Sequence, residues 1–568
     1  MANLKLTTAR TLKWNAIDRI SSQLIYAVVG VVLANILSRE EFGLVGALAI
    51  FQSFATIFID SGFGAALLRE KHTPSQTDYS TVFWFNTGVS LTVYAALFIA
   101  APGIAMMFDK SEALIPMSRV MFLTFVINGL AIVQTNRLMK RMEVKMIAVS
   151  NTVALIVSGA VGVWLAIRGY GAWAMVWYSV VMAAVKALIL WGTGHWMPAL
   201  TFSIATLRKI HRVGASVFSS ALLNTISLNI YNFVIGVFYS ISDLGLYNQA
   251  DKWSKMGYTS ISQTLTSSFV PMLSEAQDSP SDFVRYVTKT TRFTAFILFP
   301  AMTGMALVAT PLFHLLFAHK WDDAIPLFRI LAIRGIFIVL ISLYSNYLLA
   351  LGKARALFAS EIIKDALIFV AILTTIFSRS ITTLILGQMA AALLTWLILL
   401  PLTSRSLRHH FSAPRPTQAA SSPSTSDSTS AQPGTAIPHS TASRSESATA
   451  NFDSTITDSA TTNFDSTTTD SATAQPGTAI PSTVSILTLL RPILPFVALT
   501  ASAAGGAYLL NPLFATVTAG LSLFLASLIR LLLLSLTALL LYLLLLRLFR
   551  VPELPEALSY LLGRFRRR

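Results

Sequence analysis

Long apolar runs separated by short polar turns recur along nearly the whole chain of 568 residues. About twenty apolar residues in a helix are enough to cross a hydrocarbon core about 30 Å thick. The pattern therefore predicts an all-α polytopic membrane protein with fourteen spans. We expect them at Trp14–Leu37, Phe42–Phe63, Tyr79–Ala101, Ile115–Gln134, Ile147–Ile167, Trp173–Gly194, Val213–Tyr239, Gln249–Pro271, Phe293–Phe317, Ile325–Leu349, Ile362–Phe377, Ile381–Leu402, Ile486–Leu510 and Leu513–Leu546.

Two segments recur in the same order in the two halves of the chain. Ile115 to Leu138 aligns with Ile325 to Leu348, and Glu41-Phe-Gly-Leu44 aligns with Asp243-Leu-Gly-Leu246. Chance likeness between apolar helices is the alternative, because such helices draw on few residue types. Six spans separate the copies, so a true repeat would be parallel, as in transporters whose substrate site lies between two lobes. The repeat predicts two six-helix lobes around a central cavity, with two further C-terminal helices.

Composition divides the chain into five parts. A tract rich in Ser, Thr, Ala and Pro contains the duplicated words AQPGTAIP and NFDST, and such a sequence is expected to be disordered. It is either a regulatory tether or a tolerated expansion of a connecting loop, since long loops add little entropic cost. The predicted parts are an N-lobe (1–200), a C-lobe (201–403), this cytoplasmic loop (404–485), spans thirteen and fourteen (486–548) and a basic amphipathic segment (549–568).

The charged residues indicate topology and exclude a nucleic-acid partner. The net charge is +16, but Lys and Arg cluster in alternate loops, such as the group from Arg137 to Lys145. This positive-inside pattern predicts that both termini are cytoplasmic. A basic surface for nucleic acid would need a folded soluble domain, which the pattern does not predict. The chain has no Cys, which excludes disulfides and thiolate metal sites, and no enzyme motif predicts a catalytic residue, a metal site or a cofactor.

Polar side chains inside the predicted spans are the candidates for a binding site, because polarity is costly in lipid and usually faces the bundle interior. In the eighth span Lys252, Lys255, Thr259 and Gln263 follow one helical face. The alternatives are that Lys and Arg reach the membrane interface and that Ser and Thr only join helices. The substrate-binding candidates are Arg19, Asn15, Ser22, Tyr26, Asp60, Lys186, Asn224, Lys252, Lys255, Gln263 and Arg334.

Four motifs together resemble the Wzx-type flippases of the multidrug/oligosaccharidyl-lipid/polysaccharide (MOP) exporter superfamily. They are SREEFGLVGALAIF, SDLGLYNQADKW, PMLSEAQD and FAHKWDDAIPLFRILA, at matching positions around the first, seventh, eighth and tenth spans. The long Ser/Thr tract departs from the family pattern but interrupts only a connecting loop. The resemblance implies an inner-membrane flippase that moves polyprenyl-diphosphate-linked oligosaccharides for lipopolysaccharide, capsule or exopolysaccharide, with membrane lipids and the polysaccharide polymerase machinery as further partners.

The residues leave two other functions open. A cation-coupled drug exporter of the same superfamily would be expected to carry more acidic than basic residues in its cavity. A membrane-embedded enzyme of glycan assembly would need a catalytic acid or base grouped on an outer loop. The sign of the charge in the cavity is the observation that separates the first alternative from a flippase.

Overall fold

The computed structural model describes residues 2–60, 63–69, 73–108, 112–194, 196–276, 279–412, 485–552 and 555. These residues form helices and turns, with no strand among them. Most of the polar tract 404–485 and of the basic segment 549–568 lies outside the described residues, so the predictions for them stay predictions. The first half contains α1 (Ala2–Ile36), α2 (Arg39–Asp60), α3 (Phe63–Arg69), α4 (Gln76–Met107), α5 (Leu114–Met121), α6 (Leu123–Lys140), α7 (Val144–Ile167) and α8 (Trp173–Gly194).

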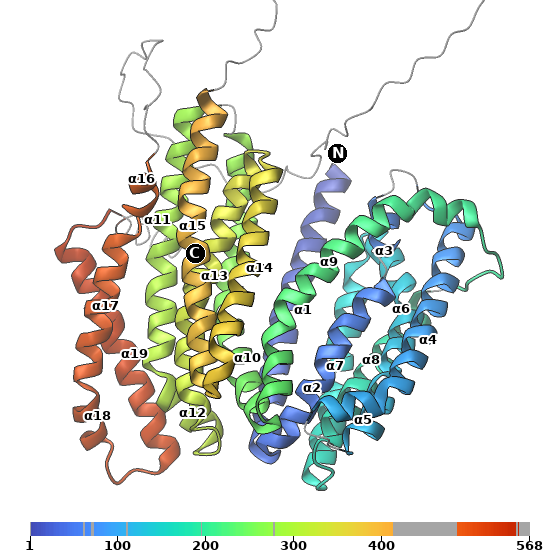
Figure 1. Cartoon of the computed structure of the whole chain (residues 1–568), viewed down its shortest axis with the longest axis horizontal. Coiled ribbons are helices and arrows are strands. Elements are labelled where there is room, and N and C mark those ends of the chain that lie inside the picture. The colour runs from blue at the N-terminus through green and yellow to red at the C-terminus, as the bar shows by residue number, and fades with distance from the viewer. Residues whose placement is uncertain are drawn as a thin grey trace, which may run out of the picture.

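The second half and the C-terminal helices follow in the order that the sequence predicts. They are α9 (Ile204–Phe238), α10 (Ile241–Glu275), α11 (Pro280–Leu307), α12 (Ala309–Phe317), α13 (Ala324–Ala350), α14 (Ala354–Thr375), the 3-10 turn η1 (Ile376–Ser378), α15 (Ile381–Ser412), α16 (Ile486–Leu490), α17 (Leu494–Leu509), α18 (Asn511–Val517) and α19 (Leu523–Leu548). The two halves stand side by side, and α16 to α19 flank the second (Figure 1). We call the end of the bundle at which the N-terminus lies the proximal end, and the opposite end the distal end (Figure 1).

The prediction of an all-helical, multi-span membrane protein is confirmed, whereas the count of fourteen spans is not. Eleven helices of the described chain are long and apolar enough to cross a membrane, or twelve if α11 and α12, bent by 59°, form one span. Helix α10 is rich in Ser and Thr and carries Asp251, Lys252 and Lys255, and α14 carries four charged residues. Because of these polar residues, neither helix is among the eleven. Polar side chains in such helices usually face the bundle interior or water.

Two predicted spans are interrupted. The span expected at Ile115–Gln134 is α5 followed by α6, with a break at Phe122, and it continues to Lys140. The span expected at Ile486–Leu510 is also broken, into α16, α17 and α18, and it continues to Val517. The chain then turns at residues 518–522, and the last span is Leu523–Leu548, so the predicted start of that span at Leu513 is wrong. Gly520 lies in this turn, and its φ of +89° is one that an L side chain rarely adopts.

The two halves have matching contacts, as a parallel repeat requires. In the first half α6 contacts α4 and α8, and α7 contacts α8; in the second half α13 contacts α11 and α15, and α14 contacts α15. The pair α2 and α6 corresponds in the same way to α10 and α13. Helix α9 departs from this symmetry, because it packs mainly against α2 and α3 of the first half, whereas its counterpart α1 packs against α7. The symmetry supports the repeat seen in the sequence.

The repeated acidic-x-Gly motif forms the contact between the halves at the distal end. Ser38 and Glu41 cap the start of α2 reciprocally: the Ser38 N–H donates to Glu41 Oε2 (2.6 Å) and the Glu41 N–H donates to Ser38 Oγ (3.2 Å). Ser240 and Asp243 cap α10 in the same way, at 3.3 and 3.0 Å. In both copies the acidic residue therefore completes a capping box that starts the second helix of its half.

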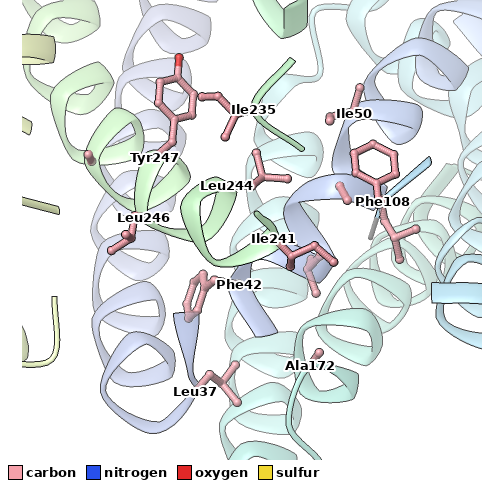
Figure 2. Close-up of a cluster of buried hydrophobic side chains, with 14 of the residues drawn as sticks. Leu37, Phe42, Ile50, Phe108, Ala172, Ile235, Ile241, Leu244, Leu246 and Tyr247 are labelled. Carbon is pink, nitrogen blue, oxygen red and sulfur yellow. The ribbon is translucent and has the colours of Figure 1, made fainter. Parts of the chain in front are cut away.

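The glycine of each motif allows α2 and α10 to touch backbone to backbone. A Cβ atom on Gly43 would lie 1.9 Å from the Ile241 carbonyl oxygen, and one on Gly245 would lie 2.1 Å from the Arg39 carbonyl oxygen. Small residues permit this close approach of membrane helices. Buried apolar side chains from both halves surround the crossing, among them Phe42, Ile241 and Leu244 (Figure 2). The two halves are thus closed against each other at the distal end.

A second set of contacts holds the same end closed. The turn between α1 and α2 meets the loop between α12 and α13, where Arg39 Nη1 lies 2.5 Å from Asp323 Oδ2. Trp321 Nε1 donates to the Ala34 carbonyl (2.9 Å), and Lys320 Nζ donates to the Asn35 carbonyl (2.9 Å). We call the loop 318–323 the latch loop, because its side chains bind the first half of the protein.

Candidate functional site

A cavity of about 510 Å³ lies between the two halves, directly behind the distal crossing. Its walls come from α1, α2, α5 and α8 of the first half and from α9 and α10 of the second. Phe42, Val45 and Gly46 line the part nearest the crossing. The volume is in the range of sites that bind small molecules or parts of larger ones.

Two lysines of α10 bring positive charge to this cavity. Lys252 and Lys255 are one turn apart and both line it. Lys252 Nζ lies 4.3 Å from the centre of the Tyr26 ring on α1, and a Cβ on Gly30 would lie 2.2 Å from this nitrogen. Gly30 therefore leaves the space in which the ammonium group crosses from α10 to α1. Lys252 forms no ion pair with any residue that the structure describes.

Lys255 belongs to a charge cluster in the cavity wall. Its Nζ lies 2.5 Å from Asp251 Oδ2, and Arg334 Nη2 of α13 lies 3.3 Å from the other carboxylate oxygen, Asp251 Oδ1. The Asp251 and Arg334 side chains are each only 6% exposed, so this carboxylate is committed to two cations inside the protein. Together with Lys252 the cluster has three cations and one anion, so the cavity wall is positive.

The rest of the polar lining is neutral, and part of it has no partner. Tyr178 Oη, Asn232 Oδ1, Asn248 Nδ2 and Gln249 Nε2 are buried and have no hydrogen-bond partner among the described atoms. An unpaired buried polar group is costly unless a ligand or water satisfies it. These groups can serve a ligand with many hydroxyl groups, while the lysines can serve an anion.

The candidates taken from the sequence fall into three groups. Tyr26, Lys252 and Lys255 line the cavity, and Arg334 is buried behind its wall. Arg19, Ser22, Lys186, Asn224 and Gln263 are described but do not line it; Arg19, Asn224 and Gln263 are exposed, and Ser22 Oγ donates to Asp18 Oδ1 (3.3 Å). The side chains of Asn15 and Asp60 lie outside the described residues.

Sequence reasoning missed several lining residues. Asn232 and Gln249 were hidden because they lie off the polar faces that helical spacing indicates, and Tyr178 and Ser179 lie in an apolar run. Asn248 was overlooked although it lies four residues before Lys252 on the same face of α10. Asp251 could have been found from the sequence, because a carboxylate four residues before Lys255 can form an ion pair with it along a helix.

We expect Asp251→Asn to destabilise the protein. The substitution leaves Arg334 buried without its carboxylate, and breaking a buried pair costs about 3 kcal/mol or more. The melting temperature of the purified protein should therefore fall by several degrees. The matched control is Asp282→Asn, which breaks an exposed pair with Arg285 and should change little. Equal melting temperatures for the two variants would contradict the claim that the buried pair of Asp251 and Arg334 stabilises the fold.

The fold and the positive cavity define a class: a two-lobed membrane transporter with its site between the lobes. The structure of the lipid II flippase MurJ in an inward closed conformation has this fold, with a TM-score of 0.58 and 12% identity over 70% of this chain and 92% of that one. This likeness confirms the predicted two-lobed, all-helical architecture.

A family model described as "Polysaccharide biosynthesis protein" matches residues 32–326, slightly more than half of the chain. The chain therefore belongs to this family, and the predicted Wzx-type relationship is confirmed. It is 25% identical over 352 residues to the succinoglycan biosynthesis transport protein ExoT of Rhizobium meliloti, covering 62% of this chain and 71% of ExoT. It is 24% identical over 402 residues to the lipopolysaccharide biosynthesis protein WzxC of Escherichia coli, covering 69% and 77%. The family and these relatives identify a transporter of polysaccharide biosynthesis and not an enzyme.

Proposed function

We propose that this protein moves a polyprenyl-diphosphate-linked oligosaccharide from the cytoplasmic to the outer leaflet of a bacterial inner membrane. The observation that carries the proposal is the Lys252 ammonium group, which reaches into a cavity between the lobes without a carboxylate partner among the described residues. A diphosphate needs cations where water is scarce, and Lys252 and Lys255 supply them. The polyprenyl tail can remain in lipid while only the polar part enters.

The neutral lining fits the sugar part of such a substrate. Asn232, Asn248 and Gln249 offer unpaired donors and acceptors, and Tyr26 and Tyr178 offer ring faces and hydroxyl groups. A drug exporter that binds cations would be served by an acidic cavity, whereas the only lining carboxylate among the described residues, Asp251, is already paired with Lys255 and Arg334. The charge of the site therefore favours an anionic substrate.

In this proposal the protein transports by alternating access: the central cavity opens first at one end of the bundle and then at the other. The crossing of α2 and α10 and the latch loop close the distal end, which we assign to the outside. Binding of the diphosphate to Lys252 and Lys255 would place the substrate between α1 and α10, and the substrate would leave when the distal contacts part. The polysaccharide polymerase machinery would receive it there.

A reconstitution experiment tests this function. The purified protein is placed in liposomes that contain a short-chain, fluorescent polyprenyl-diphosphate oligosaccharide, and a sugar-binding lectin added outside reports how fast the substrate reaches the outer leaflet. We expect faster appearance than in protein-free liposomes, and no acceleration for a cationic dye. Acceleration of the dye alone would favour the drug exporter.

The proposed orientation is tested by single cysteines, which can be placed freely because the chain has none. We expect a membrane-impermeant thiol reagent added to intact cells to label Glu112→Cys and Ser378→Cys at the distal end. It should not label Glu143→Cys at the proximal end, which lies in a loop of the basic set. Labelling of Glu143→Cys alone would reverse the assignment of the two sides.

A further inference from the structure

A cluster of two histidines and one aspartate lies at the distal end, apart from the central cavity. His314 is near the end of α12, and His319 and Asp322 are in the latch loop. His319 Nδ1 lies 2.9 Å from Asp322 Oδ2, and His314 Nε2 lies 3.0 Å from Asp322 Oδ1. One nitrogen from each imidazole and one carboxylate oxygen all lie within 4.8 Å of one another.

The contact between His314 and Asp322 is close. His314 Nε2 lies 3.0 Å from Asp322 Oδ1, and this carboxylate oxygen is buried. The His314 side chain is itself mostly covered, at 18% exposed. A buried carboxylate oxygen needs a partner, either a proton donor or a cation. A cation held between the imidazole nitrogens and the carboxylate would satisfy all three ligand atoms at once.

We propose that His314, His319 and Asp322 bind a divalent transition-metal ion of the Zn²⁺ type. Imidazole nitrogens and a carboxylate oxygen are ligands of Zn²⁺ at about 2.0–2.2 Å, and three protein ligands with one water complete a tetrahedron. Ligand atoms of such a tetrahedron are about 3.3 Å apart by this geometry, so the two short contacts need to lengthen only slightly. A metal ion on His319 Nδ1 requires the neutral imidazole with its proton on Nε2, because the ligating nitrogen must offer its lone pair.

The backbone of the latch loop brings the ligands together. Ala318 has φ +52°, a conformation that L residues rarely adopt, and it turns the chain so that the His319 ring lies 4.4 Å from that of His314, centre to centre. Two arginines, Arg329 and Arg530, line a small neighbouring pocket together with His314, and each donates a hydrogen bond to a threonine. Arg329 Nη2 donates to Thr310 Oγ1 (2.8 Å), and Arg530 Nε donates to Thr518 Oγ1 (2.6 Å).

Because of where the site lies, a bound metal ion would affect the closure of the distal end. Two of its ligands are in the loop whose Lys320, Trp321 and Asp323 hold the first half of the protein. A bound ion would tie this loop to α12 and make it stiffer, so that the latch loop keeps the shape in which it closes the distal end. The site is independent of the substrate cavity and of what the protein carries.

Metal binding to the purified, tag-free full chain tests this proposal. We expect one Co²⁺ ion per chain to give the visible absorption of a tetrahedral site, and Zn²⁺ to displace it. His314→Gln, His319→Gln and Asp322→Asn should each weaken Zn²⁺ binding at least about tenfold, because even changes to groups around a metal site cost 10- to 100-fold. Zn²⁺ should also raise the melting temperature of the native chain and not of these variants.

The other histidines of the chain provide the control. His409→Gln/His410→Gln removes the adjacent pair at 409–410, and His211→Gln removes an exposed histidine of α9; both variants should bind as the native chain does. His319 is 62% exposed, so His319→Gln tests the site without disturbing the core. The proposal is overturned if the native chain shows no such site, or if binding is lost in the control variants and kept in His319→Gln.

Discussion

Replacing Lys252 and Lys255 together by Gln is expected to lower substrate translocation by about 100-fold or more. Each lysine would contribute one hydrogen bond between charged groups, worth about 1.5 kcal/mol or more, and each 1.4 kcal/mol is a tenfold change. The initial rate in the liposome assay measures the effect. Lys255→Arg should be milder, because the charge persists although the geometry of the donors changes.

The double variant is expected to fold. Lys252 has no ion-pair partner among the described residues, so its loss breaks no ion pair, and Asp251 keeps Arg334 when Lys255 is replaced. Lys353→Gln, at the proximal start of α14 and outside the cavity, is the matched control and should transport normally. A double variant that reaches the membrane and transports as fast as this control would place the substrate site elsewhere.

Gly245→Ala is expected to stop transport while the protein still folds. The new Cβ would lie 2.1 Å from the Arg39 carbonyl oxygen and 3.1 Å from the Gly43 nitrogen, and these are backbone atoms that cannot turn aside. Because the two lobes can part, the clash is relieved by opening the distal end. The variant should therefore stay open to the outside, with transport reduced at least about tenfold, since a loss of 1.4 kcal/mol of closure already suffices.

A cysteine in the cavity reports this change directly. Thr259→Cys on α10 lines the cavity, and a membrane-impermeant reagent added from the distal side should label it in the Gly245→Ala background much faster than in the native background. Gly304→Ala in α11 is the control, because a Cβ there meets nothing within 4 Å. If labelling and transport are the same for both glycine variants, the crossing is not the distal closure.

The repeated acidic-x-Gly motif was found in the sequence, but only part of its role could be inferred there. Glu41 and Asp243 were recognised as matching positions, and the structure shows why: each completes a capping box at the start of an equivalent helix. Gly43 and Gly245 matched as well, but the reason lies between the lobes, where each glycine meets the backbone of the other half. Local chemistry is readable from neighbouring residues, whereas a contact between distant helices is not.

The sequence by itself determined the class of this protein: an all-helical, duplicated transporter with a cationic α10, because span length, repeat and charge pattern are local properties of a chain in a membrane. Only the tertiary structure decided which polar groups share a cavity. It placed Lys252 against Tyr26 but left Arg19, Asn224 and Gln263 exposed. It also joined Asp251 to Arg334, and His314 to Asp322. The physical reason is that helical spacing defines the face of a helix, whereas the packing of the other helices decides what that face meets.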